Sequence, residues 1–330
     1  MIDFSKQLEN PAVYDHKPKS IQVIQTHISW VSLTGKYAYK IKKPVNFGFL
    51  DFSTLEKRKA FCEKELKVNK RFSPDVYISV LPITKTAAGL RIGGSGKPVE
   101  YCIKMKELPQ DRLMSKLLAK KKITKTHIDN IARSVACVYA KEKSTPAMRK
   151  VSLAGIKYSI NENFEQTRDF IGKLVDKKSF GLIKSRVLSF MRRNNDLLKK
   201  RSAKTVMCHG DLHSGNIFIA DKIYIFDAIE FNERFVYLDP AADVAFFAMD
   251  LDFNRRKDLA DFFIRQYVKY SRDKGILDVL DFYKCYRAYV RAKVNGLMSV
   301  DQHLGSEKRA EAAKTSRKYF DLALGYTKNL

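Results

Sequence analysis

The sequence of 330 residues contains no run of about 18 apolar residues, so no transmembrane helix is expected. Its first residues lack a basic region followed by an apolar stretch, and no signal peptide is expected either. The five cysteines are scattered and never stand at C-x-x-C spacing, which argues against a disulfide framework and a zinc site. These absences predict a cytoplasmic protein with reduced thiols. The 45% hydrophobic content is that of a globular protein with one large domain or two smaller ones.

Acidic residues are scarce, with 36 Asp and Glu against 62 Lys and Arg. The imbalance is uneven, because residues 115–150 carry a net charge of +8 and residues 173–204 one of +9, whereas residues 209–252 carry −7. A basic surface indicates nucleic acid or an anionic substrate as a partner. Lysines at helical spacing also occur on solvated helix faces that have no partner. The charge alone therefore leaves both interpretations open.

Phosphate-binding glycine loops are absent as well. No G-x-G-x-x-G separates the first two expected strands. The run Gly93–Pro98 has a superficial likeness to the end of a Walker A loop, but Arg91 stands where the first glycine is required and Pro98 replaces Ser or Thr. We predict a glycine-rich turn over Gly89–Pro98 instead.

The pattern along the chain predicts two parts, an α+β lobe over residues 1–108 and a mainly helical lobe over residues 109–330. In the first part we expect strands over Ser20–Gln25, Trp30–Leu33, Tyr37–Lys42, Val76–Pro82 and Val99–Met105. One helix begins at the capping box Ser53-x-x-Glu56 and runs to about Phe72. In the second part, Thr126-x-x-Asp129 predicts a helix cap, and a single short β island is expected over Ile217–Phe226.

The most informative motif is H-G-D-x-H-x-x-N over residues 209–216, followed by Asp227 eleven residues after Asn216. An acid, an amide and a second acid in this order are typical of a kinase catalytic loop. Asp211 would accept a hydroxyl proton, while Asn216 and Asp227 would hold magnesium against a nucleoside triphosphate. The alternative is a turn in which Asp211 and Asn216 only bond to backbone.

The β island suggests how the two metal ligands meet. If it forms a hairpin in which Ile217 pairs with Phe226, then Asn216 faces Asp227, with their Cβ atoms about 4.5–5.5 Å apart. Magnesium usually takes only one or two ligands from protein, and phosphate and water complete its shell. An amide oxygen and a carboxylate fit that requirement.

Lys40 is the candidate phosphate-binding lysine, because Tyr37–Lys40 matches the V-A-I-K register of a kinase strand. Lys42 lies on the same strand face and remains the alternative. Glu65 falls on an otherwise apolar stripe of the following helix, where a carboxylate is costly unless it is paired. We therefore predict that Glu65 pairs with Lys40; the alternative is a partly exposed glutamate at the helix edge.

The turn over Gln25–Ser29 stands where kinases carry a glycine-rich loop. Its backbone amides and the hydroxyls of Thr26 and Ser29 are candidates for contacting phosphate. His27 is as readily explained as a plain turn residue.

Further segments complete a family resemblance: Thr26–Val31, Tyr37–Pro44 and Phe47–Asp51. With the catalytic loop, they make the chain similar to the aminoglycoside phosphotransferase and choline kinase group. Within that group it most resembles bacterial small-molecule kinases that often carry a second kinase domain with a Walker A loop, which this chain lacks. The resemblance extends from about residue 15 to 300. It implies the bilobal protein-kinase-like fold, with a small, mostly antiparallel β lobe that has one main helix and a larger helical lobe.

The resemblance also implies roles for single residues. ATP and Mg²⁺ are the implied cofactors, Asp211 the catalytic base, and Asn216 and Asp227 the metal ligands. His209 would brace the loop, and the Glu107 carbonyl and Leu108 amide would hydrogen-bond adenine. Three further acids are expected near the site: Glu230 would contact metal or substrate, and Asp239 and Asp243 would bond to the loop backbone.

Arg287 and Arg291 share one helix face at i, i+4 spacing. Arginine forks suit phosphate and carboxylate groups, so both are candidates for binding an anionic substrate. The alternative is a charged helix face without a ligand.

These observations favour an ATP- and Mg²⁺-dependent phosphotransferase that acts on a hydroxyl of a small molecule, such as a sugar, a sugar acid or an amino alcohol. We expect a neutral or anionic acceptor and no membrane partner. A protein Ser/Thr kinase is the alternative, but Gly210 replaces the arginine of His-Arg-Asp, and only about ten residues follow Asp227 before the next helix. A non-catalytic, basic nucleic-acid-binding protein would not need Asp211, Asn216 and Asp227 together.

Overall fold

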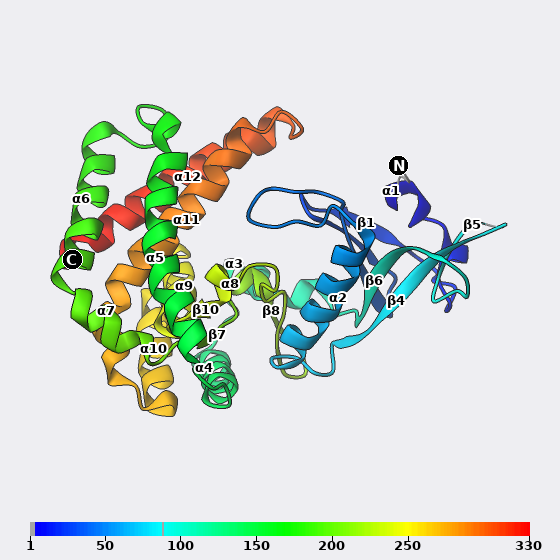
Figure 1. Ribbon diagram of the computed structural model, residues 1–330, viewed down its shortest axis with the longest axis horizontal. Helices are drawn as coiled ribbons and strands as arrows, with labels where there is room; N and C mark the ends of the chain where they lie inside the picture. The colour runs from blue at the N-terminus through cyan, green and yellow to red at the C-terminus, as the bar shows by residue number, and fades with distance from the viewer. Residues whose placement is uncertain (1–3, 88) are drawn as a thin grey trace. The chain divides into compact units, whose positions relative to one another are not determined.

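The computed structural model describes residues 4–87 and 89–330, which form two compact units (Figure 1). The first unit contains the chain up to Lys116 together with Asn216–Asn232, and the second contains Leu117–Gly215 and Glu233–Leu330. An antiparallel sheet dominates the first unit and helices dominate the second, which confirms the expected α+β class. The chain is therefore not divided once, near residue 108, because the segment after Asn216 packs with the sheet unit.

The first unit is built on a six-stranded antiparallel sheet with the strand order β1-β2-β3-β6-β4-β5. Its strands are β1 (Gln22–Gln25), β2 (Ser29–Leu33), β3 (Tyr37–Lys42), β4 (Tyr77–Thr86), β5 (Gly89–Ile92) and β6 (Pro98–Lys106). The prediction of a turn over Gly89–Pro98 was wrong in its first half, because Leu90 and Ile92 are buried and β5 pairs with β4. Strand β3 lies in the interior of the sheet, between β2 and β6, so its inward side chains are shielded from water.

One long helix, α2 (Leu55–Lys70), packs against β4 and β6 (Figure 1). Its N-cap is Thr54, whose Oγ1 accepts a hydrogen bond from the Lys57 amide at 3.3 Å, so the predicted cap at Ser53 was wrong. The Ser53 hydroxyl instead donates to Asp51 at 2.6 Å. A short helix, α1 (Phe4–Gln7), precedes the sheet. Helix α2 buries Glu65 and Asn69 completely, and both residues face the functional segments described below.

The second unit is mainly helical. Its long helices are α4 (Lys125–Ala140), α5 (Pro146–Gln166), α6 (Lys177–Arg193), α7 (Asn195–Ser202), α9 (Ala241–Phe253), α10 (Lys257–Ser271), α11 (Leu280–Val300) and α12 (Ser306–Tyr326). Shorter helices are α3 (Met114–Ala119) and α8 (Glu233–Val236). Helix α4 is capped by Thr124 in a capping box with His127, not by Thr126 as predicted. Helix α9 is buried along nearly its whole length, so its acidic side chains lie inside the unit.

Two small sheets flank the catalytic-loop sequence, where only one β island was expected. Strands β7 (Val206–Met207) and β10 (Tyr237–Leu238) pair in the second unit, and β8 (Ile217–Ile219) and β9 (Ile223–Ile225) pair in the first. The β7–β10 pair is too short to be recognised by an alternating pattern, because strands of two residues carry no period. The two sheets fix the two ends of the loop in their respective units.

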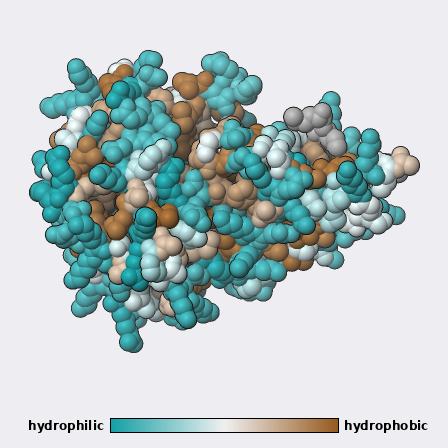
Figure 2. Space-filling model, viewed as in Figure 1, coloured by the Kyte–Doolittle hydropathy of each residue, from teal (hydrophilic) through white to brown (hydrophobic). Residues whose placement is uncertain are grey.

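The face shown in Figure 2 is largely hydrophilic, with small apolar areas between charged side chains. Within residues 4–87 and 89–330, no helix combines the length and the apolar character that a bilayer-crossing segment needs.

Candidate active site

The β8–β9 hairpin has a register one residue away from the predicted one. Its pairs are Ile217 with Ile225, Phe218 with Tyr224 and Ile219 with Ile223. The predicted register was wrong because the turn closes tightly, with the Ala220 amide donating to the Lys222 carbonyl at 3.1 Å. Asn216 therefore lies opposite Phe226, whose amide donates to the Asn216 carbonyl at 3.1 Å. Asp227 follows one residue beyond that pair, so the argument from opposed Cβ atoms no longer applies.

Asp227 is placed by its backbone and by Lys40. Its φ angle of 60° lies in the left-handed region, which Asp adopts more readily than most residues. Its amide donates to the Tyr77 hydroxyl at 3.0 Å, and its Oδ1 accepts a hydrogen bond from Lys40 Nζ at 2.5 Å. The carboxylate is 46% exposed. Its outer face is thus open to a ligand.

Both candidate lysines contact Glu65, which is fully buried. Lys40 Nζ lies 2.8 Å from Glu65 Oε1, as predicted, and Lys42 Nζ lies 2.5 Å from Glu65 Oε2. Burial by itself would raise the pKa of Glu65, but the two ammonium groups lower it to about 2. Burial would lower the pKa of Lys40, whereas Asp227 and Glu65 hold it well above its usual value. Glu65 and Lys40 are therefore both charged at neutral pH.

Glu230 pairs with Lys42 at 2.5 Å and is only 4% exposed. Burial raises the pKa of the Glu230 carboxyl, although the Lys42 ammonium acts in the opposite direction. Because the carboxylate is enclosed with Lys42, its position does not support the predicted contact with metal or substrate.

The segment assigned to adenine borders a hollow of about 560 Å³ in the first unit. Glu107 and Leu108 line it, together with Asp221 from the β8–β9 turn. The Glu107 carboxylate fixes this segment, because its Oε2 accepts hydrogen bonds from the amides of Thr34 and Gly35, both at 2.7 Å. A hollow of several hundred Å³ is in the range that holds a small organic ligand.

The turn between β1 and β2 uses its own hydroxyl groups. Thr26 Oγ1 accepts from the Ser29 amide at 2.9 Å and donates to the Ser29 carbonyl at 3.2 Å. Ser29 is 1% exposed, so its side chain lies inside the sheet. The Thr26 hydroxyl is thus committed to the turn, whereas the Ser29 hydroxyl is buried and has no hydrogen-bond partner among the described residues. The predicted contacts of these two hydroxyls with phosphate therefore gain no support.

In the second unit, the start of the catalytic loop is held by Asp243 of α9. Asp243 Oδ2 accepts from the amides of His209 at 2.7 Å and Gly210 at 3.1 Å, and from the Tyr139 hydroxyl at 2.5 Å. His209 is fully buried, consistent with a bracing position. Asp243 thus makes the backbone contacts that the resemblance implied.

Asp239 has a different function from the one expected. Its carboxylate binds Arg201 through two hydrogen bonds, of 2.7 and 2.6 Å, and accepts from the Ala241 amide at 3.0 Å. These contacts anchor the start of α9 and not the loop backbone, so this assignment is corrected.

Asp211 is 36% exposed, and its Oδ2 lies 3.4 Å from His213 Nε2. His213 Nδ1 accepts a hydrogen bond from the Gly215 amide at 3.0 Å, which favours the tautomer with the proton on Nε2, facing Asp211. Burial by itself would raise the pKa of Asp211, but His213 and Arg291 hold it well below the usual value. His213 was not assigned a role from the sequence, although the H-G-D-x-H spacing was a signal for it.

The two arginines of α11 differ in what they contact. Arg287 is buried, and its guanidinium donates to Asp243 Oδ1 and to the Ala242 carbonyl, both at 3.3 Å. Its predicted role in substrate binding is not supported, because it is committed to α9. Arg291 is partly buried and lies over the Tyr319 ring, 5.7 Å from its centroid. In the part of the chain that the structure describes, no carboxylate lies within 4 Å of the Arg291 guanidinium.

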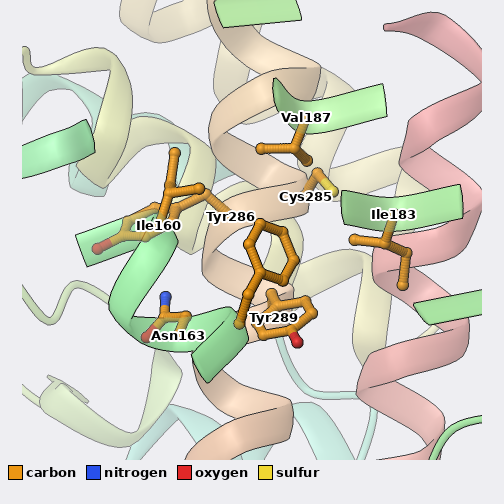
Figure 3. Close-up of a pocket in the computed structure, with 8 residues that line it drawn as sticks. Ile160, Asn163, Ile183, Val187, Cys285, Tyr286 and Tyr289 are labelled. Carbon is orange, nitrogen blue, oxygen red and sulfur yellow. The ribbon is translucent and has the colours of Figure 1, made fainter. Parts of the chain in front are cut away.

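A second hollow is lined by side chains of α5, α6 and α11 (Figure 3). Asn163 and Tyr289 contribute polar atoms to a mostly apolar lining. Its volume of about 10 Å³ holds roughly one water molecule, which is too little for an organic acceptor.

The side-chain oxygen atoms of Asn216 and Asp227 are the candidate metal ligands of the site. Among the described residues, no group of three or more His, Cys, Asp and Glu side chains is arranged to hold an ion. Asn216 and Asp227 offer hard oxygen atoms, and Mg²⁺ usually needs only one or two such protein ligands. These two residues fit a magnesium ion that phosphate and water also coordinate.

Comparison with known proteins places this geometry in a family context. The model of the phosphotransferase enzyme family matches residues 151–278. Uncharacterized proteins of Mycobacterium tuberculosis and Mycobacterium bovis are 31% identical over 278 residues, which are 83% of this chain and 54% of theirs. The chain therefore spans about half the length of the curated relatives it matches.

Solved structures share the fold at low sequence identity. The GDP complex of aminoglycoside 2'-phosphotransferase-IIIa matches with a TM-score of 0.56 at 14% identity, over 93% of this chain and 94% of that one. An ethanolamine kinase of Plasmodium vivax matches with a TM-score of 0.52 at 14% identity, over 92% and 81%. A choline/ethanolamine kinase family protein of Mesorhizobium loti matches with 0.53 at 9% identity, over the whole of both chains. The family-model match and the shared fold confirm that this chain resembles the aminoglycoside phosphotransferase and choline kinase group and has its protein-kinase-like fold.

Proposed function

We propose that this chain catalyses the ATP- and Mg²⁺-dependent transfer of a phosphoryl group to a hydroxyl of a small molecule. The observation that carries the proposal is the pair of contacts made by Lys40, which binds both Glu65 and Asp227. A strand lysine held by a helix glutamate beside a metal-binding acid is the arrangement with which kinases hold the phosphates of ATP. The family-model match and the kinase-like neighbours support the same reaction class.

In this proposal the first unit holds the nucleotide. The backbone of Glu107 and Leu108 binds adenine. When the nucleotide binds, the ammonium group of Lys40 breaks its contact with Asp227 and contacts the phosphates instead. That exchange leaves the Asp227 carboxylate for the metal, which Asn216 also ligates. Magnesium, when bound, neutralises the charge that develops on the phosphoryl oxygens.

Asp211 of the second unit acts as the base. Its low pKa keeps the carboxylate ionised at neutral pH, and its partial exposure lets an acceptor hydroxyl approach. The oxygen of the acceptor hydroxyl attacks the γ-phosphorus while its proton passes to Asp211. At the same time, the bond between the γ-phosphorus and the oxygen that leaves with ADP breaks. His213 orients the carboxylate through its Nε2 proton.

Arg291 supports an anionic acceptor. It lies near enough to Asp211 to lower the pKa of that carboxyl, and no carboxylate of the described residues pairs with it. Arg287, a buried arginine of the same helix, is instead bound to Asp243. A guanidinium without a protein carboxylate is suited to a carboxylate or phosphate of the substrate. We therefore favour a sugar acid or a phosphorylated sugar over a cationic acceptor.

Matched acceptors test both parts of the proposal. Phosphoryl transfer from labelled ATP is measured with D-gluconate against D-glucose, D-glycerate against glycerol, and with ethanolamine and kanamycin. We expect Mg²⁺-dependent transfer that prefers the anionic member of each pair. Arg291→Gln should remove the preference, whereas Lys293→Gln, which removes a charge from the same helix, should keep it. Transfer to ethanolamine or kanamycin alone would contradict the assignment of an anionic acceptor.

A further inference from the structure

The segment from Ile225 to Glu230, here called the Asp227 segment, is attached to α2, to β4 and to the connection between them by side chains that no step of the proposed reaction uses. We propose that Asn69, Ser73 and Tyr77 are positioning residues that hold Asp227 in one arrangement before any ligand binds. The inference rests on the proposed function only in taking Asp227 as a metal ligand.

Two of these residues bind the segment through paired hydrogen bonds. Ser73 Oγ donates to the Ile225 carbonyl at 2.7 Å and accepts from the Ile225 amide at 2.9 Å. Asn69 Nδ2 donates to the Ala228 carbonyl at 3.3 Å, and Asn69 Oδ1 accepts from the Ala228 amide at 2.8 Å. Each side chain therefore satisfies both polar groups of one residue, as a neighbouring β-strand would.

Tyr77 binds between these two anchors, because its hydroxyl accepts from the Asp227 amide at 3.0 Å. The hydrogen bonds thus fall on Asp227 and on positions two before and one after it. Asn69, Ser73 and Tyr77 are 0%, 2% and 1% exposed, so water does not compete for these bonds. Leaving a buried polar side chain without a hydrogen-bond partner costs free energy, so these hydrogen bonds should rarely break.

The backbone of Asp227 explains why such anchoring is needed. Its φ of 60° lies in a region that non-glycine residues seldom adopt unless the surroundings fix it. The hydrogen bonds to Ile225 and Ala228, on either side of Asp227, keep its backbone from returning to a more common φ angle. The pair formed by Lys42 and Glu230 adds a further anchor two residues after Ala228.

Preorganisation is the functional consequence. A ligand that is ordered by folding loses less conformational freedom when it binds a cation than one on a mobile loop. Asn69, Ser73 and Tyr77 would therefore set how strongly Asp227 binds metal, although they bond to the backbone of the segment and not to the Asp227 carboxylate. The second lysine of β3, Lys42, belongs to this anchoring set and not to the phosphate-binding group.

Hydrogen exchange of the nucleotide-free protein tests the inference directly. In the wild type, the amides of Asp227 and Ala228 should be strongly protected. Asn69→Ala should increase exchange at Ala228 at least tenfold, and Tyr77→Phe should do so at Asp227. The control is Asn46→Ala, which removes an asparagine bonded to the Gly48 amide in an exposed loop of the same unit. Unchanged exchange at both amides in folded variants would overturn the inference.

Nucleotide binding provides the second readout. ADP affinity is measured by calorimetry in EDTA and in a Mg²⁺ titration. Asn69→Ala should keep its affinity in EDTA and need about tenfold more Mg²⁺ for half-maximal effect, whereas Asn46→Ala should match the wild type. An equal loss of affinity with and without Mg²⁺ would show a merely structural role and contradict the inference. If Asn69→Ala does not fold, Tyr77→Phe, which keeps the aromatic ring, takes its place in both measurements.

The two failures can be told apart. If the wild type binds no nucleotide with Mg²⁺, the proposed function is wrong, while the exchange measurement still decides whether the anchors hold the Asp227 segment. If Mg²⁺-dependent binding is present and the variants leave it and the exchange unchanged, only the anchoring inference is wrong.

Discussion

The charged groups of the first unit and the proposed base of the second are built in opposite ways. Lys42, Glu65 and Glu230 are buried, and each is paired with an opposite charge. Asp211 is 36% exposed, and its contact with His213 is long, at 3.4 Å. The first arrangement holds its members in fixed positions, whereas the second leaves a carboxylate accessible to a hydroxyl group. In the proposed reaction, the buried pairs would orient their neighbours and the more exposed acid would take part in the chemistry.

The same difference decides what a mutation does. Removing one member of a buried ion pair leaves its partner charged and desolvated, which costs about 3–5 kcal/mol of stability. Removing an exposed charge costs little stability, because water solvates the space that it leaves. Variants of the buried ion pairs in the first unit should therefore lose folding stability, whereas variants at Asp211 should lose catalytic turnover.

Asp211→Asn should have the largest effect of these changes. The amide cannot accept the hydroxyl proton, so phosphoryl transfer should fall by about 10²–10⁴-fold while ATP binding persists. Single-turnover transfer and nucleotide calorimetry measure the two quantities. Asp196→Asn, at a side chain that is 95% exposed, is the matched control and should leave both unchanged. Full turnover by the Asp211 variant would mean that another group is the base.

Glu65→Gln should be the most destabilising of the changes considered. The neutral amide leaves Lys40 and Lys42 with too little negative charge, and the free energy of unfolding should fall by about 3–5 kcal/mol. Denaturant unfolding measures it. Glu63→Gln changes a 57% exposed glutamate on the same helix and should alter stability by less than about 0.5 kcal/mol. Equal effects of the two variants would remove the distinction between the buried network and the exposed surface.

The contribution of Glu65 should also depend on pH. Its pKa is lowered from 4.5 to about 2 in the folded protein, so the ionised carboxylate stabilises the fold above about pH 4.5. That stability is lost as the pH falls from 4.5 towards 2, and it amounts to about 3 kcal/mol. Unfolding of the wild type and of Glu65→Gln from pH 7 to pH 3 should show a constant difference at first, which then shrinks. A difference that grows on acidification would reverse the sign of the predicted interaction.

Gly215→Ala should have the smallest effect. An added Cβ would lie 2.6 Å from His213 Cε1, so the ring must move away from its position beside Asp211. We expect kcat to fall about tenfold, or about 1.4 kcal/mol, with unchanged nucleotide affinity. Gly181→Ala is the control, because its Cβ has open space in α6 and should raise stability by about 0.5–1 kcal/mol without altering kcat. Unaltered kcat in both variants would show that His213 does not orient Asp211.

Part of the candidate site followed from local reasoning. The contact between Lys40 and Glu65 was predictable, because a carboxylate on an apolar helix stripe must find a charge, and β3 offered one. The second partner, Lys42, was left as an alternative when in fact both lysines bind the same carboxylate. The pattern could not show this, since alternation gives the face of a strand and not the reach of each side chain.

Other predictions failed by one or two residues. The hairpin register shifted because a tight turn at Ala220–Lys222 replaced the four-residue connection that was assumed. The caps moved from Ser53 to Thr54 and from Thr126 to Thr124, between hydroxyl residues of nearly equal capping strength. The differences in free energy between such neighbouring alternatives are small, so tertiary contacts decide which of them forms.

The sequence by itself determined the kind of chemistry, because an acid, an amide and an acid at this spacing, with a strand lysine and a helix glutamate, specify the groups that phosphoryl transfer needs. Only the tertiary structure decided how those groups are held. Asn69, Ser73 and Tyr77 reach the Asp227 segment from about 150 residues away along the chain, and Asp243 binds a loop more than 30 residues before it. Hydrogen bonds between such distant residues depend on which surfaces pack together, and a local pattern of residues carries no record of that packing.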